Sequence, residues 1–153
     1  MDQAIKTYYS SPLGILEIVA NQKNIISINF VARRGRNTNN TLLKKCVVQL
    51  DEYFTGKRKK FNLPLEPHGT LWQKNVWQIL GVVPYGSVIS YQDLAAAVGQ
   101  PKSARAIGQA VGKNPIPIII PCHRVVASKG WGGYSGGIKR KIWLIKQETL
   151  TNG

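Results

Sequence analysis

The sequence is poor in acidic residues, cysteine and histidine. Seven Asp or Glu residues stand against 21 Lys or Arg in a chain of 153 residues, which has two cysteines and two histidines. Two cysteines are too few for a disulfide scaffold, and a reducing compartment leaves both free. A four-ligand zinc site needs both cysteines and both histidines to converge, and their spacing matches no zinc motif. We therefore expect neither a disulfide framework nor a metal site.

Long apolar runs are missing as well. The longest apolar segments are far too short to span a bilayer, and Met1-Asp2-Gln3 does not begin a signal peptide. These absences predict a soluble, cytoplasmic protein without a membrane partner. The length suits one ordinary domain, or a small domain joined to a medium one. A hydrophobic content of 43% excludes disordered and collagen-like chains.

What the chain does have is an excess of positive charge, +14 at pH 7. Such an excess attracts polyanions, and nucleic acid is the commonest polyanion inside cells. Solubility through self-repulsion and binding to acidic lipid are the alternatives. Residues 67–153 contain ten Lys or Arg but only two acids, Asp93 and Glu148. The C-terminal part of the chain is therefore nearly devoid of acid.

Residues 1–66 are predicted to form a small α/β domain. The segment 5–31 has the alternation of β-strands, interrupted by the turn-like sequence NQKN. Apolar residues then recur at helical spacing from Leu42 to Phe54. Cys46 lies on this apolar stripe, so we interpret it as a core residue.

A second domain, residues 67–153, is predicted to be mostly helical. The segment NLPLEPHGT, with two prolines and a glycine, has the composition of a linker between the two domains. Residues 71–80 follow the pattern of an amphipathic helix. Ser90, followed three residues later by Asp93, has the capping-box pattern that begins a helix, and Gly99 ends that helix.

A short turn, Gln100-Pro101-Lys102, leads from this helix to another predicted over residues 103–114. Two short helices across a tight turn form a helix-turn-helix candidate, although many such hairpins bind nothing. The second helix has no acid but several basic and small residues: Lys102, Ala104, Arg105, Ala106, Gly108, Gly112 and Lys113. Small residues would let the backbone come close to a sugar-phosphate wall. In so cationic a protein, this pattern favours DNA binding.

The stretch PIIIPCHRVV sets Cys122 and His123 side by side after three isoleucines. A nucleophilic cysteine needs a base or a cationic neighbour, because the unperturbed pKa of its thiol is about 8.5. Consecutive side chains on a strand or helix diverge, so a bond between these two needs irregular backbone or an intervening water. Pro121 makes regular structure less favourable here. The local chemistry leaves two interpretations open, a reactive thiol and a buried structural one.

The same residues carry a resemblance to a known family. PCHRV, preceded by NPIPIII and followed by GGYSGG, resembles the O6-alkylguanine-DNA alkyltransferases, single-turnover repair proteins that move an alkyl group from guanine onto their own cysteine. The resemblance covers essentially the whole chain and is strongest from VPYGSVISYQDLAAAVG to WLIKQE. It implies an α+β fold: an N-terminal α/β domain with a short antiparallel sheet, then a helical C-terminal domain with a helix-turn-helix and the active-site cysteine.

By this resemblance, Cys122 is the nucleophile and the alkyl acceptor. His123 would be its general base through a water, and Glu148 would orient the histidine. Asn114 would brace the turn around the cysteine, a role compatible with that of a helix C-cap. For Glu148 the alternative is a solvated charge near a helix end.

The resemblance also implies contacts with DNA. Tyr91 would crowd the target phosphate and hydrogen-bond the guanine edge, and Arg105 would fill the gap left by the flipped base. Ser135 would donate a hydrogen bond toward O6. The implied pocket residues are Tyr91, Tyr134, Ser135, Pro117 and Val125, and the implied DNA-binding residues are Lys102, Ser103, Ala104, Arg105, Ala106 and Gly108. The small residues would let their helix enter the minor groove.

The implied function is a stoichiometric methyltransferase that flips O6-alkylguanine, and also O4-alkylthymine, out of double-stranded DNA. The alkyl group would pass irreversibly to Cys122, and no cofactor is implied because the nucleophile is spent. We expect a monomer, with cooperative binding to DNA left open, in the cytoplasm and at the nucleoid of a microbe. A non-catalytic DNA-binding or lesion-sensing protein is the alternative, although it would not require Cys122, His123, Asn114 and Glu148 together.

Two features depart from the family pattern. The zinc ligands of mammalian members have no counterparts here, which fits a short microbial form without structural metal. Trp131, in SKGWGG, is bulky and lies in the loop near the expected pocket. It puts the tolerance of large alkyl groups, such as benzyl, in doubt.

Overall fold

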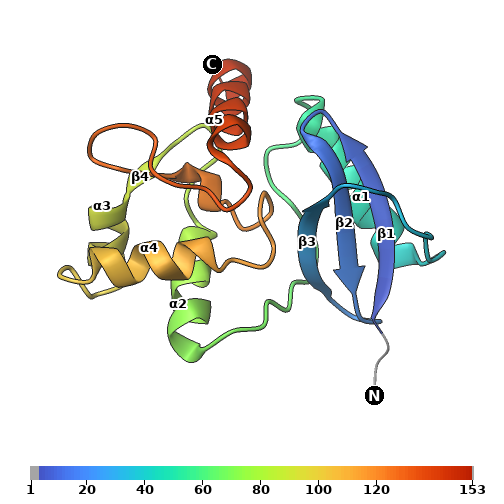
Figure 1. The fold of residues 1–153 in the computed structure, drawn as a ribbon, viewed down its shortest axis with the longest axis horizontal. Coiled ribbons are helices and arrows are strands. Elements are labelled where there is room, and N and C mark those ends of the chain that lie inside the picture. Colours follow the sequence, from blue (N-terminus) through green and yellow to red (C-terminus); the bar gives the residue numbers. More distant parts are fainter. Residues whose placement is uncertain (1–3, 153) are drawn as a thin grey trace. The chain divides into compact units, whose positions relative to one another are not determined.

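The computed structural model describes residues 4–152, so Met1, Asp2 and Gln3, on which the expectation about a signal peptide rests, lie outside the described residues. The chain divides into two compact units, and the division falls between His68 and Gly69. The first unit contains a three-stranded antiparallel sheet and one helix, and the second is mostly helical (Figure 1). This is the predicted α+β fold.

The sheet of the first unit contains β1 (Ile5–Ser11), β2 (Gly14–Ala20) and β3 (Ile25–Val31), in that order. Alternate residues of β2 are buried, among them Leu16, Ile18 and Ala20. Because successive side chains of a strand point to opposite faces, this alternation places one face of β2 in the core. The strands predicted from the alternation over 5–31 are therefore confirmed.

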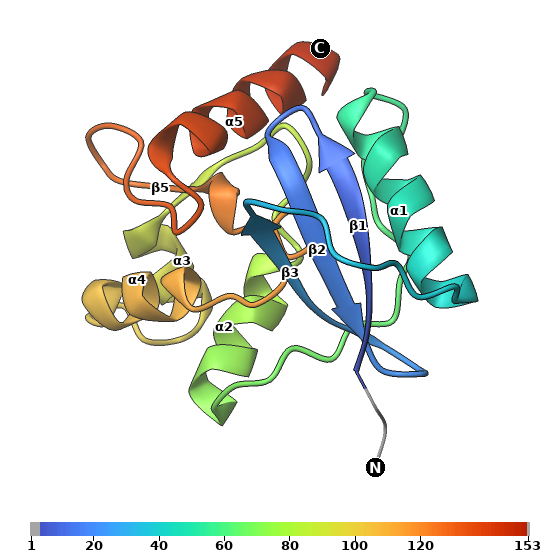
Figure 2. The same cartoon turned by 45° about the vertical axis from the view of Figure 1, so that its right-hand side comes forward.

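A single long helix, α1 (Thr41–Phe54), packs against β1 and β2 (Figure 2). It begins at Asn40, whose side chain accepts a hydrogen bond from the Leu43 amide at 3.0 Å. Leu43, Cys46 and Leu50 on its inner face are fully buried. Burial raises the pKa of the Cys46 thiol to about 12, so this cysteine is an unreactive part of the core.

The second unit contains four α-helices, one 3-10 turn and two short strands among its described residues. These elements are α2 (Leu71–Leu80), β4 (Ile89–Ser90), α3 (Tyr91–Ala97), α4 (Ala104–Gly112), η1 (Cys122–Arg124), β5 (Val125–Val126) and α5 (Ile138–Asn152). None of the helices within residues 4–152 is long and apolar enough to cross a membrane.

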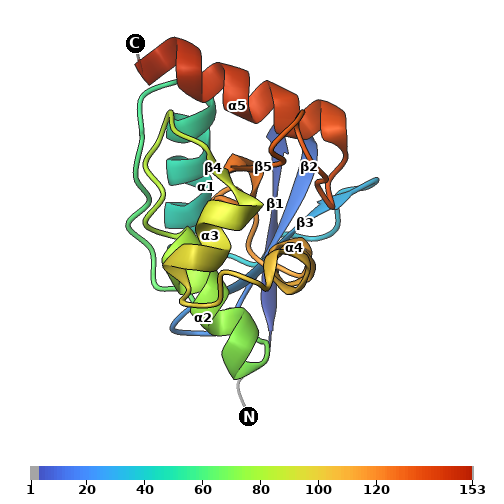
Figure 3. The same ribbon diagram turned by 90° about the vertical axis from the view of Figure 1, so that its left-hand side faces the viewer.

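The pair α3 and α4 forms the predicted helix-turn-helix, and both helices pack on α2 (Figure 3). Ser90 begins α3 by accepting a hydrogen bond from the Asp93 amide, which is half of the predicted capping box. The Trp77 indole of α2 donates to the Ala110 carbonyl of α4 at 2.8 Å. This buried bond fixes α4 against α2.

A two-stranded parallel pair ties the segment after Cys122 to the start of α3. Ile89 of β4 pairs with Val125 of β5, and Ser90 pairs with Val126. Because β4 runs directly into α3 and β5 follows η1, the pairing brings the cysteine turn beside the helix-turn-helix. The sequence alone did not predict this pairing of β4 with β5.

Candidate active site

The chain reaches Cys122 through a strained turn that Asn114 holds in place. Ile118 has φ 74°, the only positive φ among the described non-glycine residues. Such a conformation costs roughly 1–3 kcal/mol. The Asn114 side chain donates to the Ile120 carbonyl at 2.8 Å and accepts from the Ile116 amide at 3.0 Å. This clamp offsets the strain and lets the buried isoleucines pack in the core while the chain turns toward the cysteine.

Cys122 opens the 3-10 turn η1 directly after Pro121, and only 3% of its surface is exposed. It borders a cavity of about 200 Å³. The lining residues come from α3, α4, η1 and the segment before α5: Tyr91, Gly108, Val111, Gly112, Cys122, Gly133, Tyr134 and Ser135. The irregular backbone that a working Cys122–His123 pair requires is therefore present.

Burial is the main influence on the Cys122 thiol and raises its pKa to about 11. A hydrogen bond from the Asn114 side chain and the positive charge of Lys141 act in the opposite direction. The thiol is therefore protonated at neutral pH, and any nucleophilic role requires a group that removes its proton.

His123 is fully buried, and its Nε2 lies 2.6 Å from Glu148 Oε2. Burial lowers the pKa of His123, although the bond to Glu148 acts to raise it. A neutral imidazole that donates from Nε2 to the carboxylate has its lone pair on Nδ1. That Nδ1 atom is buried and has no hydrogen-bond partner among the described residues. His123 is thus held as a base with an available acceptor nitrogen.

Glu148 is held by Arg124 as well as by His123. Arg124 Nε donates to Oε1 at 2.8 Å and Nη2 to Oε2 at 3.0 Å, while Nη1 donates to the Val83 carbonyl at 2.7 Å. Burial alone would raise the pKa of Glu148, but its bonds to His123 and Arg124 outweigh burial and hold the pKa at about 2. The alternative of a solvated charge at a helix end is wrong, because Glu148 is 1% exposed.

The sequence predicts a bracing role for Arg124 rather than a chemical one, but it did not predict that Arg124 pairs with Glu148. The signal was present, since a charged residue between two apolar stretches must find an opposite charge if it is buried. Residues 67–153 offer only Asp93 and Glu148 as such a partner. The first is exposed at the start of α3, which leaves the second.

Sequence reasoning missed Lys141, whose side chain is fully buried. Its Nζ donates to the carbonyls of Val125 and Gly133, and lies 5.9 Å from the centre of the Tyr91 ring. Burial lowers its pKa to about 8, and interaction with Cys122 acts in the opposite direction. Lys141 and Glu148 are two turns apart on α5, so one helix face supplies both charges.

The implied pocket residues separate into two groups. Tyr91, Tyr134 and Ser135 line the cavity beside Cys122. The hydroxyl of Tyr134 is buried without a hydrogen-bond partner among the described residues, and burial raises its pKa well above the usual value. Pro117 is half-buried and Val125 is fully buried within β5, and both lie outside the cavity lining. In their place α4 contributes Val111 and two glycines to the lining.

The residues implied for DNA binding lie in the first half of α4 and just before it. Ser103 is the N-cap residue of α4, and Lys102 and Arg105 are exposed. Ala104, Ala106 and Gly108 are half-buried. Gly108 also borders the cavity, so the same helix joins the basic surface to the cysteine.

Metal ligands are not gathered anywhere in residues 4–152. No three His, Cys, Asp or Glu side chains within this range lie close enough together to hold a metal ion. The acids and bases beside Cys122 instead bond to one another and to backbone carbonyls.

Two known domain families match the chain. Residues 71–150 match the DNA binding domain of 6-O-methylguanine DNA methyltransferase, and residues 4–67 match its ribonuclease-like domain. The constitutive methylated-DNA–protein-cysteine methyltransferase of Bacillus subtilis is 42% identical over 160 residues, covering 94% of this chain and 96% of the relative. The corresponding protein of Methanosarcina barkeri is 38% identical over 146 residues, covering 90% and 92%.

Solved structures are similar over nearly the full length. The O6-methylguanine methyltransferase of Mycobacterium tuberculosis has a TM-score of 0.89 at 33% identity, covering 97% of this chain and 94% of that one. The M. tuberculosis protein OGT in complex with DNA has a TM-score of 0.86 at 36% identity, covering 94% and 93%.

Proposed function

The chain belongs to the 6-O-methylguanine DNA methyltransferase family, and on that premise we propose that it repairs DNA by moving the alkyl group of O6-alkylguanine onto its own Cys122. O4-alkylthymine is a second substrate. The observation that carries the assignment is a buried cysteine bordering a cavity that is also lined by α4 of the helix-turn-helix. Next to that cysteine in the sequence are buried His123 and Arg124, and both bond to the buried carboxylate of Glu148.

The substrate base must leave the duplex to reach Cys122, because the thiol is almost fully buried. Flipping costs a few kcal/mol of unstacking free energy, and contacts between the protein and the DNA must offset this cost. In this proposal exposed Arg105 fills the gap in the stack, and Tyr91 crowds the phosphate of the target nucleotide. Small residues on α4 let the helix approach the minor groove. The excess of Lys and Arg binds the phosphates, so affinity falls with salt.

Proton transfer begins the chemistry, because the Cys122 thiol has a pKa of about 11. In our proposal the thiol proton passes through a water to His123 Nδ1, which has no hydrogen-bond partner among residues 4–152. Glu148 stabilises the imidazolium that forms, and Arg124 keeps Glu148 ionised. Lys141 stabilises the thiolate by its charge.

The thiolate then attacks the alkyl carbon in line with the C–O6 bond. A carbon–sulfur bond forms, the C–O6 bond breaks, and guanine departs with the bonding electron pair. Guanine takes up one proton, which balances the proton that His123 removed from the thiol. Hydrogen bonds from Ser135 and the buried Tyr134 hydroxyl stabilise the charge that develops on the guanine. The thioether product has no easy route back, so each molecule acts once and no cofactor takes part.

The cellular location follows from the substrate. A highly cationic protein that acts on alkylated DNA works where the chromosome is, which in a microbe is the nucleoid within the cytoplasm.

The test is to incubate the protein with a duplex that contains one O6-methylguanine and then to map its peptides by mass. We expect one methyl group per molecule, on the peptide that contains Cys122. Cys122→Ala should accept none, and Cys46→Ala is the matched control that should be methylated like the wild type. Tight lesion binding with an unmodified Cys122 would instead identify a lesion sensor and refute the proposal.

A further inference from the structure

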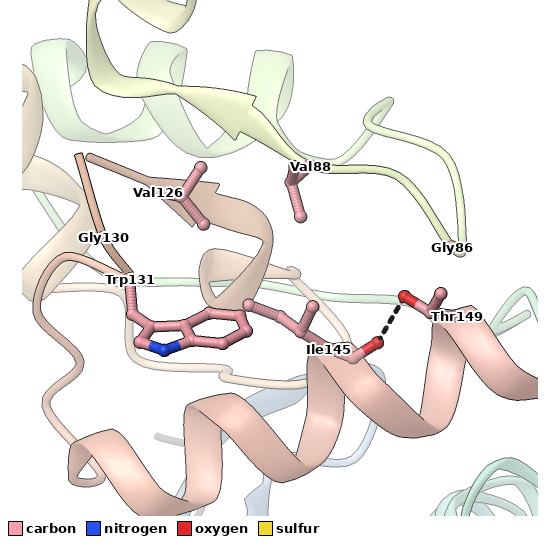
Figure 4. Close-up of a pocket in the computed structure, with 7 residues that line it drawn as sticks. All are labelled: Gly86, Val88, Val126, Gly130, Trp131, Ile145 and Thr149. Carbon is pink, nitrogen blue, oxygen red and sulfur yellow. Dashed lines mark hydrogen bonds between the residues drawn. The ribbon is translucent and has the colours of Figure 1, made fainter. Parts of the chain in front are cut away.

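The segment between β5 and α5, which we call the 127–137 loop, borders two separate cavities. Its residues 133–135 line the cavity beside Cys122. Its residues 130–131 line a second cavity of about 410 Å³, which shares no lining residue with the first. The second cavity is bordered by Gly86, Val88, Val126, Gly130, Trp131, Ile145 and Thr149 (Figure 4). A shift of this loop therefore changes the walls of both cavities.

Trp131 belongs to the second cavity and not to the first. Figure 4 shows its indole beside Ile145 of α5, with Val126 and Val88 facing it across the cavity. The residue is 39% exposed, so more than half of its surface is covered and the rest is open to solvent. The indole of Trp131 thus lies outside the cavity beside Cys122. It cannot exclude large alkyl groups by filling that cavity, so any effect on them must be indirect.

The backbone next to Trp131 is tightly coupled to the wall of the Cys122 cavity. Gly132 has φ 75°, and a Cβ atom there would lie 2.9 Å from the Tyr91 ring. Tyr91 lines the cavity, so the loop touches the cavity wall one residue after the indole. Lys141 holds the next residue, Gly133, by its carbonyl. The loop therefore has a polar anchor at Gly133 and an apolar anchor at Trp131.

We propose that Trp131 is a positioning residue that sets the size of alkyl group the protein accepts, an inference that rests on the proposed function. Its indole, which lies beside Ile145, holds the 127–137 loop against Tyr91 and keeps the Cys122 cavity small. A methyl group fits this closed arrangement. A benzyl group requires the loop to move outward, which pulls the indole from its apolar contacts and slows transfer.

The test compares single-turnover transfer from duplexes that carry O6-methylguanine or O6-benzylguanine. Trp131→Ala should raise the ratio of the benzyl rate to the methyl rate by about tenfold or more. Trp131→Phe keeps an aromatic anchor and should restore a ratio close to that of the wild type. Val82→Ala is the matched control, because Val82 is 75% exposed and lies outside both cavities.

An unchanged ratio in Trp131→Ala would overturn the inference. Equal loss of both rates would also overturn it, because it would indicate a structural role alone. A wild-type protein that leaves Cys122 unmethylated would instead refute the proposed function, so the two failures are distinguishable.

If Trp131→Ala does not fold, a spectroscopic measurement on the wild-type sequence tests the inference instead. Fluorine NMR of protein labelled with 5-fluorotryptophan follows the indole, whose resonance is assigned by its loss in Trp131→Phe. The Trp131 resonance should move toward the position of a solvent-exposed indole in benzylated protein but not in methylated protein. The same position in both would contradict the inference.

Discussion

The ion pair between Glu148 and Arg124 should make the second unit sensitive to acid in a way that can be measured. The pKa of Glu148 is about 2 in the folded protein, against an ordinary value of 4.5. Each pKa unit corresponds to about 1.4 kcal/mol, so ionised Glu148 contributes about 3 kcal/mol to the free energy of unfolding. Because the folded pKa is lowered, this contribution is present above pH 4.5 and is lost as the pH falls from 4.5 to 2.

The assay is denaturant unfolding followed by tryptophan fluorescence at pH 6 and pH 2.5. All four tryptophans lie in the second unit, so their fluorescence reports that unit alone. Between these two pH values we expect the wild type to lose about 2.5 kcal/mol through Glu148, beyond any loss that other carboxylates cause. Asp93→Asn, which removes the other acid of residues 67–153, should leave this loss intact.

Glu148→Gln removes the charge and leaves Arg124 buried without a partner carboxylate, which typically costs about 3–5 kcal/mol at neutral pH. The difference in stability between wild type and this variant should therefore shrink as the pH falls to 2.5. If Glu148→Gln does not fold, the double variant Glu148→Gln with Arg124→Met can replace it, because it removes both charges. The difference in free energy of unfolding between wild type and the double variant should likewise shrink as the pH falls to 2.5. A stability difference that stays constant from pH 6 to pH 2.5 would refute the reasoning.

Three further predictions concern alkyl transfer and DNA binding. Because burial lowers the pKa of His123 below 6.5, its imidazole should stay neutral from pH 7.5 down to pH 6.5. The single-turnover rate of methyl transfer should therefore stay constant over this range, and an inflection at pH 6.5 in quenched-flow measurements would contradict this. Lys141→Met should slow methyl transfer by about tenfold or more, since the thiolate loses a nearby charge, and mass mapping over time measures the rate. Arg105→Ala should weaken binding to lesion-containing duplex by about tenfold, because the gap left by the flipped base is no longer filled, and fluorescence anisotropy measures this affinity.

Much of the fold could be predicted from periodicity and end signals. The alternation around Leu16 and Ile18 gave the strands, and the apolar stripe that includes Cys46 gave α1. Ser90 marked the start of α3 because its side chain accepts from a backbone amide that no helical carbonyl satisfies. These signals are local, so the sequence displays them directly. The family resemblance, which the domain matches confirm, supplied the rest of the architecture.

The residues of the candidate site that the sequence did not predict are positioned by contacts between distant segments. Lys141 follows Lys139 and Arg140, and such a run is typical of a solvated face. Only the orientation of α5 decides that the last of the three is buried beside Gly133 and Val125. The side of the loop on which an indole lies is likewise set by packing, so composition alone could not place Trp131.

The two roles of the isoleucine segment, core and support for a reagent, depend on each other. Ile116, Ile118 and Ile120 are buried, and that burial stabilises a segment in which Ile118 has an unfavourable φ of 74°. Ile118 lies in the irregular segment 113–121, which leads the chain from α4 to the turn that begins at Cys122 beside the cavity. The favourable packing of these isoleucines therefore offsets the strain in the segment that leads to Cys122. The same core then excludes water from the His123–Glu148 bond, which strengthens it.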